Sequence, residues 1–253
     1  MRIISTRTMA TTLALVILGI APRPAGAQNA GNGYLFHAPE GRLTLRGGYS
    51  IPTANSDIFD FVTQNLTLKK SDFGSFNLGG EIAVSVSSRW DVSFDASYMR
   101  ASAPSADRNY IDNNNQEIRQ TTTFERVPLM VDARYYLTAP GRSIGRLAWI
   151  PTHLVPYVGA GGGAMYYKFS QDGDFVDYQT LNVFTPANGF VSDGWAPAVQ
   201  GFGGFDVSIT PMLAITTDVR YIYSRARPGT DFSDFNRIDL SGASASIGLT
   251  VRM

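Results

Sequence analysis

Hydrophobic and polar residues alternate strictly along the last part of the chain, from Ala243 to Met253. The odd-numbered positions there are Ala, Ile, Leu, Val or Met, and the even-numbered positions are Ser, Gly, Thr or Arg. Successive side chains of a β-strand point to opposite faces, so this period of two predicts a strand with one apolar and one polar face.

Seven earlier segments alternate in the same way, with the glycine-rich fifth segment showing the pattern least clearly. The eight segments are 42–51, 76–86, 90–99, 127–137, 154–169, 195–207, 213–224 and 243–253. Tight turns over 87–89 and 210–212 each join two of them as a hairpin. The pattern predicts an all-β chain that folds as an eight-stranded antiparallel barrel.

The residues on the polar face indicate whether the polar or the apolar face of the barrel points outward. It carries charges of both signs among Gly and Ser, namely Arg46, Glu81, Asp91, Asp95, Asp132, Arg134, Asp206, Asp218, Arg220 and Arg252. Small residues make room in a narrow lumen and opposite charges pair there, whereas a soluble, lipocalin-like barrel would place the apolar face inside. We therefore expect a transmembrane barrel with its charges in the lumen and its apolar face toward lipid.

Strand length and aromatic placement agree with a membrane barrel. Ten residues tilted near 45° span about the 25 Å apolar band of an outer membrane. If both termini are periplasmic, the pattern predicts two aromatic girdles at the membrane boundaries. The outer girdle would hold Tyr49, Phe76, Tyr98, Tyr166, Tyr221 and Tyr223, and the inner one Trp90 and Tyr135.

Connection lengths also sort by side. Four long connections, over about 52–74, 101–123, 170–194 and 225–239, would be the external loops. The periplasmic connections would be the two tight turns and the longer segment 138–153.

The N-terminus has the features of a secretory signal peptide. Arg2 and Arg7 precede an apolar run that ends near Ile20, and Ala25-Gly26-Ala27 has the small residues of a cleavage site. This predicts a signal peptide over 1–27, cleavage between Ala27 and Gln28, and a barrel domain over 28–253. The apolar run is too short for a membrane-spanning helix, which needs about 20 residues.

Composition excludes several classes of site. The chain has no cysteine, so it holds no disulfide, thiolate metal site or catalytic thiol. Basic and acidic residues balance at 21 each, and loss of Arg2, Arg7 and Arg23 with the leader leaves 18 against 21. A nucleic-acid partner is not expected, because such a protein carries a clustered basic surface.

Three segments carry a family resemblance: Arg42 to Tyr49, Val127 to Leu137, and Pro156 to Gly163. They resemble the outer-membrane β-barrel superfamily that includes the transmembrane domain of outer-membrane protein A and outer-membrane protein W. The resemblance implies outer-membrane lipid and lipopolysaccharide as surroundings and the barrel-assembly machinery as a partner. Family members usually end in an aromatic residue that this machinery recognises, and here the last residue is Met253.

No pattern for catalysis, a metal or a cofactor is evident. Resemblance to lipid A acyltransferases or deacylases would imply a His with a Ser near the external rim, but His37 and His153 are both expected on the periplasmic side. The lumen acids have arginines at similar depth, which favours ion pairing over a paired-carboxylate catalyst. The acidic loop residues lack the twelve-residue pattern of a dedicated Ca²⁺ loop.

Three functions from different classes remain open at this point. The expected one is a structural or surface-interaction barrel, with a lumen filled by charge pairs and long loops that contact an extracellular partner. The alternative, implied by resemblance to outer-membrane protein W, is a narrow conduit for small or apolar molecules. A lipid A-modifying enzyme is the third, and we expect the chain not to be an enzyme.

Overall fold

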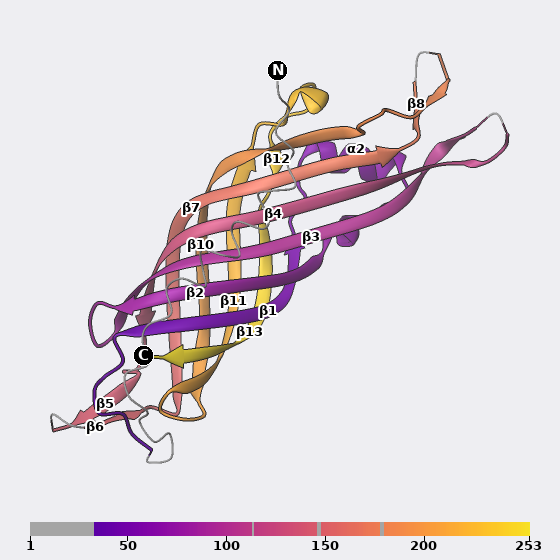
Figure 1. Cartoon of the computed structure of the whole chain (residues 1–253). Helices are drawn as coiled ribbons and strands as arrows, with labels where there is room; N and C mark the ends of the chain where they lie inside the picture. Colours follow the sequence, from indigo (N-terminus) through magenta and orange to yellow (C-terminus); the bar gives the residue numbers. More distant parts are fainter. Residues whose placement is uncertain (1–32, 113, 146–147, 178–179) are drawn as a thin grey trace, which may run out of the picture. The chain divides into compact units, whose positions relative to one another are not determined.

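The computed structural model describes residues 33–112, 114–145, 148–177 and 180–253. Eight long strands in this part form one closed antiparallel sheet (Figure 1). They are β1 (Gly41–Pro52), β2 (Ser75–Ser85), β3 (Trp90–Ile111), β4 (Glu117–Tyr136), β7 (Leu154–Gly173), β10 (Phe190–Ser208), β11 (Leu213–Ala226) and β13 (Gly242–Arg252). The last strand pairs with the first, with Leu45 opposite Leu249, so the predicted eight-stranded barrel is confirmed.

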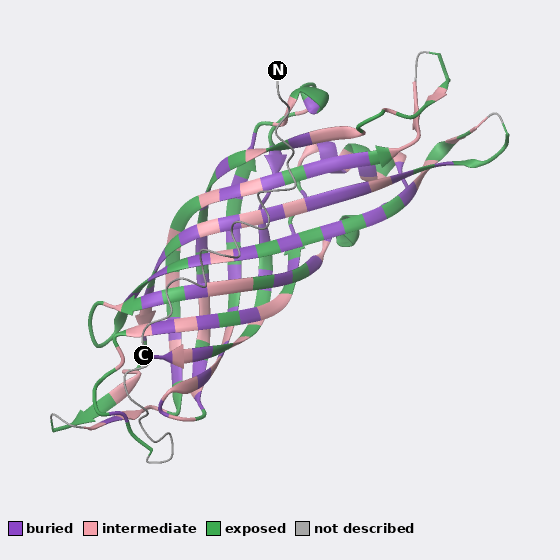
Figure 2. Cartoon of the chain, in the orientation of Figure 1, coloured by how far each residue is buried: buried purple, intermediate pink, exposed green. Residues whose placement is uncertain are grey.

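Alternation sets the two faces of the wall. In β13, Ile247 and Leu249 are exposed, at 60% and 48%, whereas Thr250 and Arg252 are buried. Figure 2 shows the same banding of buried and exposed residues along the barrel strands. The fold therefore turns apolar side chains outward and polar ones inward, the reverse of a soluble barrel.

The connections at the two ends of the barrel differ in length and content. One end carries tight turns after β2 and β10 and a small hairpin, β5 (Gly141–Ile144) with β6 (Ala148–Pro151). We refer to it as the β5–β6 end. The other, the α2 end, carries longer connections that contain α2 (Asp57–Asn65), η3 (Lys70–Phe73), β8 (Phe175–Val176), β9 (Val183–Phe184), η4 (Thr230–Phe232) and β12 (Ile238–Asp239).

The prediction of a long connection over 101–123 is wrong. β3 continues to Ile111 and β4 begins at Glu117, so the two strands run past the rim as one extended hairpin. Ser105 Oγ also donates a hydrogen bond to the Gln120 carbonyl at 3.2 Å. Likewise, β7 extends to Gly173 and β10 begins at Phe190, which shortens the connection expected over 170–194. The side chains of 101–105 are small or polar and show no clear alternation of hydropathy. Backbone hydrogen bonds between β3 and β4 do not depend on that alternation, so the strand pairing continues through this segment.

The expected signal peptide, 1–27, with its cleavage site at Ala27 and Gln28, lies outside the described residues. Among the helices that are described, none is long and apolar enough to cross a membrane.

Candidate functional site: the barrel interior

All ten charged residues expected on the inner face are buried inside the barrel, each exposed by 6% or less. They come from β1, β2, β3, β4, β10, β11 and β13, so the charges meet from around the whole wall. Such side chains are almost never buried without partners, and their contacts therefore determine what the interior can do.

A central cluster joins residues from five strands. Arg134 Nη2 donates to both carboxylate oxygens of Glu81, each at 2.7 Å. Glu81 also lies 3.6 Å from Arg46 Nη1, and Arg46 Nη2 pairs with Asp95. Arg220 Nη1 approaches the other oxygen of Asp95 at 3.2 Å. Each carboxylate of this cluster thus faces two guanidinium groups across the barrel.

Asp132 and Asp218 extend the cluster beside Arg220. Arg220 lies 3.6 Å from Asp132 and 3.3 Å from Asp218. Gln200 Nε2 donates to both oxygens of Asp132 at 2.7 and 2.8 Å, and Ser246 donates to Asp218 at 2.7 Å. The sequence pattern did not single out Gln200, a neutral residue on the inner face of β10.

A second cluster lies closer to the β5–β6 end and includes a residue that the expected network omitted. Arg42 pairs with Asp91 at 2.9 Å and with Asp206 at 3.4 Å. The Tyr136 hydroxyl donates to Asp91 at 2.8 Å, and Thr216 donates to Asp206 at 2.8 Å. Arg42 follows the same alternation as Arg46, so its parity in β1 was a sufficient signal to include it.

Arg252 has a different environment from the other arginines. Among the described residues no carboxylate lies within 4 Å of it, and its Nη2 donates to Ser208 Oγ at 2.9 Å. Its guanidinium also lies 5.8 Å from the centre of the Trp149 ring, near the β5–β6 hairpin. Arg252 therefore lies buried at the β5–β6 end of the interior without an ion pair.

Aromatic rings fill the space beside the arginines. The guanidinium of Arg134 lies 4.3 Å from the centre of the Tyr157 ring, and that of Arg220 lies 4.7 Å from the centre of Phe202. Such contacts are attractive when they exclude water. Gly159 explains how Phe202 is accommodated, because a Cβ at Gly159 would collide with the Phe202 ring. These rings were not among the expected interior residues, although each has the parity of the inward positions of its strand, Tyr157 with Gly159 and Phe202 with Asp206.

Helix α2 closes the other end of the interior. Ile58, Phe59 and Val62 are buried, and they pack into a cluster that continues onto the inner faces of β4, β7, β10 and β11. The Phe59 ring lies 5.0 Å from Phe73, 5.3 Å from Phe124 and 5.7 Å from Phe169, all edge-to-face. An apolar layer thus covers the charged one. The sequence pattern predicted a long connection over this segment and gave no indication that it enters the barrel.

The predicted girdle residues lie on the outer surface. Phe76 is 81% exposed, and Tyr49, Trp90, Tyr98, Tyr221 and Tyr223 are exposed by 43–49%, while Tyr135 and Tyr166 are half-buried. Neighbouring strands bring rings together in pairs: Tyr49 with Phe76, Trp90 with Tyr135, and Tyr166 with Trp195, at 6.0, 5.0 and 5.5 Å. Trp195, exposed by 60%, was not among the expected residues.

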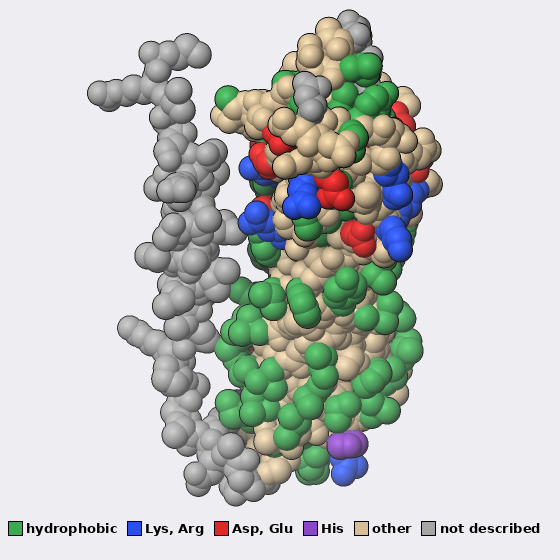
Figure 3. All heavy atoms as spheres, turned by 90° about the vertical axis from the view of Figure 1, so that its right-hand side faces the viewer, with side chains coloured by type: hydrophobic (Ala, Val, Ile, Leu, Met, Phe, Trp, Pro, Cys, Tyr) green, Lys and Arg blue, Asp and Glu red, His purple; other side chains and the backbone are tan. Residues whose placement is uncertain are grey.

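Charged side chains lie above the apolar surface toward the α2 end. Figure 3 shows hydrophobic side chains over the lower part of one barrel face and acidic and basic ones above them. Residues of alternating sign face one another on four neighbouring strands, Arg100, Glu125, Lys168 and Asp193. The Tyr166 hydroxyl donates to Asp193 at 3.2 Å, so this girdle tyrosine points its polar end toward the charges.

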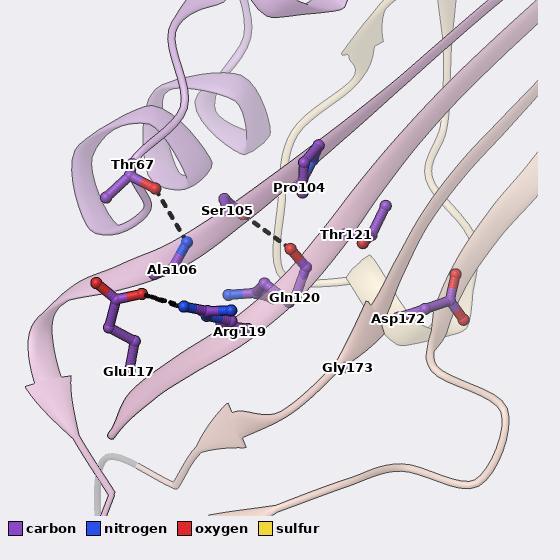
Figure 4. Close-up of a pocket in the computed structure, with 10 residues that line it drawn as sticks. All are labelled: Thr67, Pro104, Ser105, Ala106, Glu117, Arg119, Gln120, Thr121, Asp172 and Gly173. Atoms are coloured by element: carbon purple, nitrogen blue, oxygen red, sulfur yellow. Dashed lines mark hydrogen bonds and ion pairs between the residues drawn. The ribbon is translucent and has the colours of Figure 1, made fainter. Parts of the chain in front are cut away.

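A polar groove of about 510 Å³ lies beyond the rim (Figure 4). It is lined by parts of β3, β4 and β7, and one of its walls carries an exposed ion pair between Glu117 and Arg119 at 3.1 Å. Within the described part of the chain, no group of His, Asp or Glu side chains is arranged to hold a metal ion. His37 and His153 are exposed and precede β1 and β7.

No protein-family model matches the chain, and no curated protein matches its sequence. Solved outer-membrane barrels do resemble its fold. The outer membrane protein OprG from Pseudomonas aeruginosa is 15% identical, with a TM-score of 0.47 over 87% of this chain and 99% of that one. Neisserial surface protein A is 14% identical, with a TM-score of 0.44 over 84% and 96% of the two chains.

Outer membrane protein W from E. coli is 19% identical, with a TM-score of 0.39 over 86% of this chain and 99% of that one. All three TM-scores lie below 0.5. The fold of this chain therefore rests on its own strand pairing, and its function on its own residues.

Proposed function

We propose that this chain is an integral protein of the bacterial outer membrane, with a closed lumen and a structural or surface-interaction role. One observation carries the second part: two layers occupy the interior, an ion-pair network with inserted rings and an apolar cap around α2. A lumen filled in this way stabilises the wall and leaves the loops at the α2 end to make contacts.

The outer surface supports the membrane location. Large apolar side chains are exposed around the whole wall, including Leu45, Leu78 and Val219 at 64–67%. Soluble monomers rarely expose contiguous apolar patches of more than a few hundred Å². In hydrocarbon the same surface is favourable, and closure of the sheet leaves no unpaired edge.

Export through a cleaved signal peptide belongs to the same proposal. The charged start, short apolar run and small residues before Gln28 support it. Mass measurement of the protein purified from outer membranes tests it, because cleavage between Ala27 and Gln28 fixes the mature mass. A mature chain that retains the leader would contradict this step.

A narrow conduit is the second candidate, and the glycines of β7 are the feature that favours it. Gly161 and Gly163 leave the inner wall without side chains there, yet the space is used: a Cβ at Gly161 would collide with Asp132, and one at Gly163 with the Leu129 carbonyl oxygen. The glycines thus serve close packing rather than an opening, which supports the closed lumen.

Conductance distinguishes the two candidates. Mature protein refolded into a planar lipid bilayer should give no reproducible single-channel steps, because we propose that the network and the cap together close the lumen to water. Regular steps of uniform size would contradict the closed lumen. A variant with 54–72 replaced by a short Gly-Ser linker should also stay silent, since the ion-pair layer remains.

We propose no enzymatic activity. The two histidines are exposed, and each ion-paired acid of the interior has an arginine partner rather than access to a substrate. Mass spectrometry of lipid A from cells that express the protein tests this, and an added or missing acyl chain would contradict it. Assembly would depend on the barrel-assembly machinery, and lipopolysaccharide and an extracellular contact partner are proposed as neighbours of the α2 end.

A further inference from the structure

A small apolar pocket of about 220 Å³ lies at the α2 end, among the connections rather than in the lumen. Six phenylalanines line it: Phe61, Phe175, Phe184, Phe190, Phe232 and Phe235. They come from α2, β8, β9, β10, η4 and the residues after η4. Three separate parts of the chain, those between β1 and β2, from β8 to the start of β10, and between β11 and β13, therefore supply one aromatic wall.

The rings contact one another, mostly edge to face. Phe175 and Phe190 lie 4.8 Å apart between ring centres, and Phe61 and Phe235 lie 5.5 Å apart. Phe232 links the two groups, at 6.3 Å from Phe190 and 6.2 Å from Phe235. Half-exposed rings such as Phe184, at 43%, leave aromatic faces open to a ligand.

The polar part of the wall is acidic. Asp107 and Asp231 line the pocket, and no Lys or Arg among the described residues does. The Asp231 carboxylate also accepts a hydrogen bond from the Val191 N–H at 3.0 Å, which fixes its position. A cation is therefore favoured over a neutral or anionic ligand on electrostatic grounds.

A buried acceptor without a partner points to the same ligand class. Gln120 lines the pocket and is only 7% exposed, and its Oε1 accepts no hydrogen bond from any described residue. This oxygen has almost no solvent-accessible surface, so a ligand reaches it only when the amide turns toward the pocket. An unpaired buried acceptor is costly, so a ligand that donates to it favours that turn. Protonated amines are donors only.

We propose that this pocket binds small aromatic amines in their protonated form. The ligand ring packs among the phenylalanines, the ammonium group lies near Asp107 and Asp231, and it donates to Gln120 Oε1 once the amide has turned toward the pocket. An ammonium beside aromatic faces gains cation–π attraction as well. The pocket volume of about 220 Å³ corresponds to roughly seven water molecules at about 30 Å³ each. This space suits a ligand with a single aromatic ring and a short amine arm. This binding is separate from the closed lumen.

Titration by ¹⁹F NMR tests the proposal on the full mature chain in lipid nanodiscs. The probe is 4-fluorobenzylamine, and 4-fluorobenzyl alcohol is its neutral counterpart of the same size. The amine should bind saturably with a dissociation constant below about 1 mM, and the alcohol about tenfold more weakly. Empty nanodiscs correct for partitioning into lipid.

Three variants locate the site. Gln120→Ala and Asp231→Asn should each weaken amine binding several-fold, and Asp231→Asn keeps an acceptor for Val191 while removing the charge. Phe184→Ala should weaken it too, whereas Phe205→Ala should not, although both rings are 43% exposed, because Phe205 lies on the wall of β10 away from the pocket.

Two results overturn the proposal: no saturation up to about 10 mM amine, or equal binding of the amine and the alcohol. Equal loss in Phe184→Ala and Phe205→Ala would also overturn it, since binding would then not depend on the pocket. Far-UV circular dichroism of each variant shows that the barrel is folded. Bilayer conductance is measured separately, so failure of this proposal leaves the closed lumen untouched.

Discussion

At the scale of single residues, the interior depends on pairing each buried charge with an opposite one. The alternation of each strand was enough to predict which charges point inward, because side-chain direction follows from parity alone. It was not enough to say which residues meet. Arg134 pairs with Glu81 from a strand that is not its neighbour, and Phe202 fills space that Gly159 on the adjacent strand leaves open.

Arg134→Met should destabilise the barrel by about 3–5 kcal/mol, because it leaves Glu81 charged and buried without its bidentate partner. Replacing both, as Arg134→Met with Glu81→Gln, should cost less than the single change. Arg119→Met is the matched control: its ion pair with Glu117 is exposed, and its loss should cost no more than about 1 kcal/mol. Urea unfolding in lipid vesicles measures all three. A double variant less stable than Arg134→Met would contradict the pairing argument.

Gly161→Ala should destabilise by about 1–3 kcal/mol, because the added methyl group overlaps Asp132 and the Val131 carbonyl oxygen. Gly201→Ala should change stability by less than about 0.5 kcal/mol, since nothing lies within 4 Å of a Cβ there. The same unfolding assay compares them. If the two substitutions lower the free energy of unfolding equally, the close packing inferred for β7 is wrong.

At the scale of elements, strands with strong alternation were predictable, and elements without it were not. The segment 101–105 has small and polar side chains on both faces, so its place in β3 comes from pairing with β4, which no local pattern reveals. Helix α2 is short and lies in a long connection. Its apolar face is explained only by Phe73, Phe124 and Phe169, which other strands and η3 bring to it.

Phe59→Ala should lower the free energy that holds α2 in place by about 3–5 kcal/mol, because Phe59 is fully buried against three other rings. Amide hydrogen exchange over 57–65 should speed up strongly, while the amides of the barrel strands stay protected. Phe61→Ala, on the exposed side of the same helix, should alter exchange far less. Equal acceleration in both variants would show that α2 is not held as a cap by its buried face.

At the scale of the whole molecule, we propose that the α2 end of the barrel faces the outside of the cell. Trypsin added to intact cells should cut at Arg237, exposed in the connection between β11 and β13. It should not reach Arg89 or Arg142, which are exposed at the β5–β6 end, until the outer membrane is opened. Cleavage at Arg142 in intact cells would reverse the orientation.

A transmembrane barrel requires that hydrocarbon contacts its apolar outer wall. Because the chain has no cysteine, single cysteines can carry spin labels at Ile247 and Leu249 on the wall and at Asn236 in a connection. With the protein in lipid vesicles, the labels at 247 and 249 should collide with dissolved oxygen far more than with a water-soluble nickel complex, and the label at 236 should do the opposite. Equal access of the nickel complex to all three positions would contradict the membrane barrel.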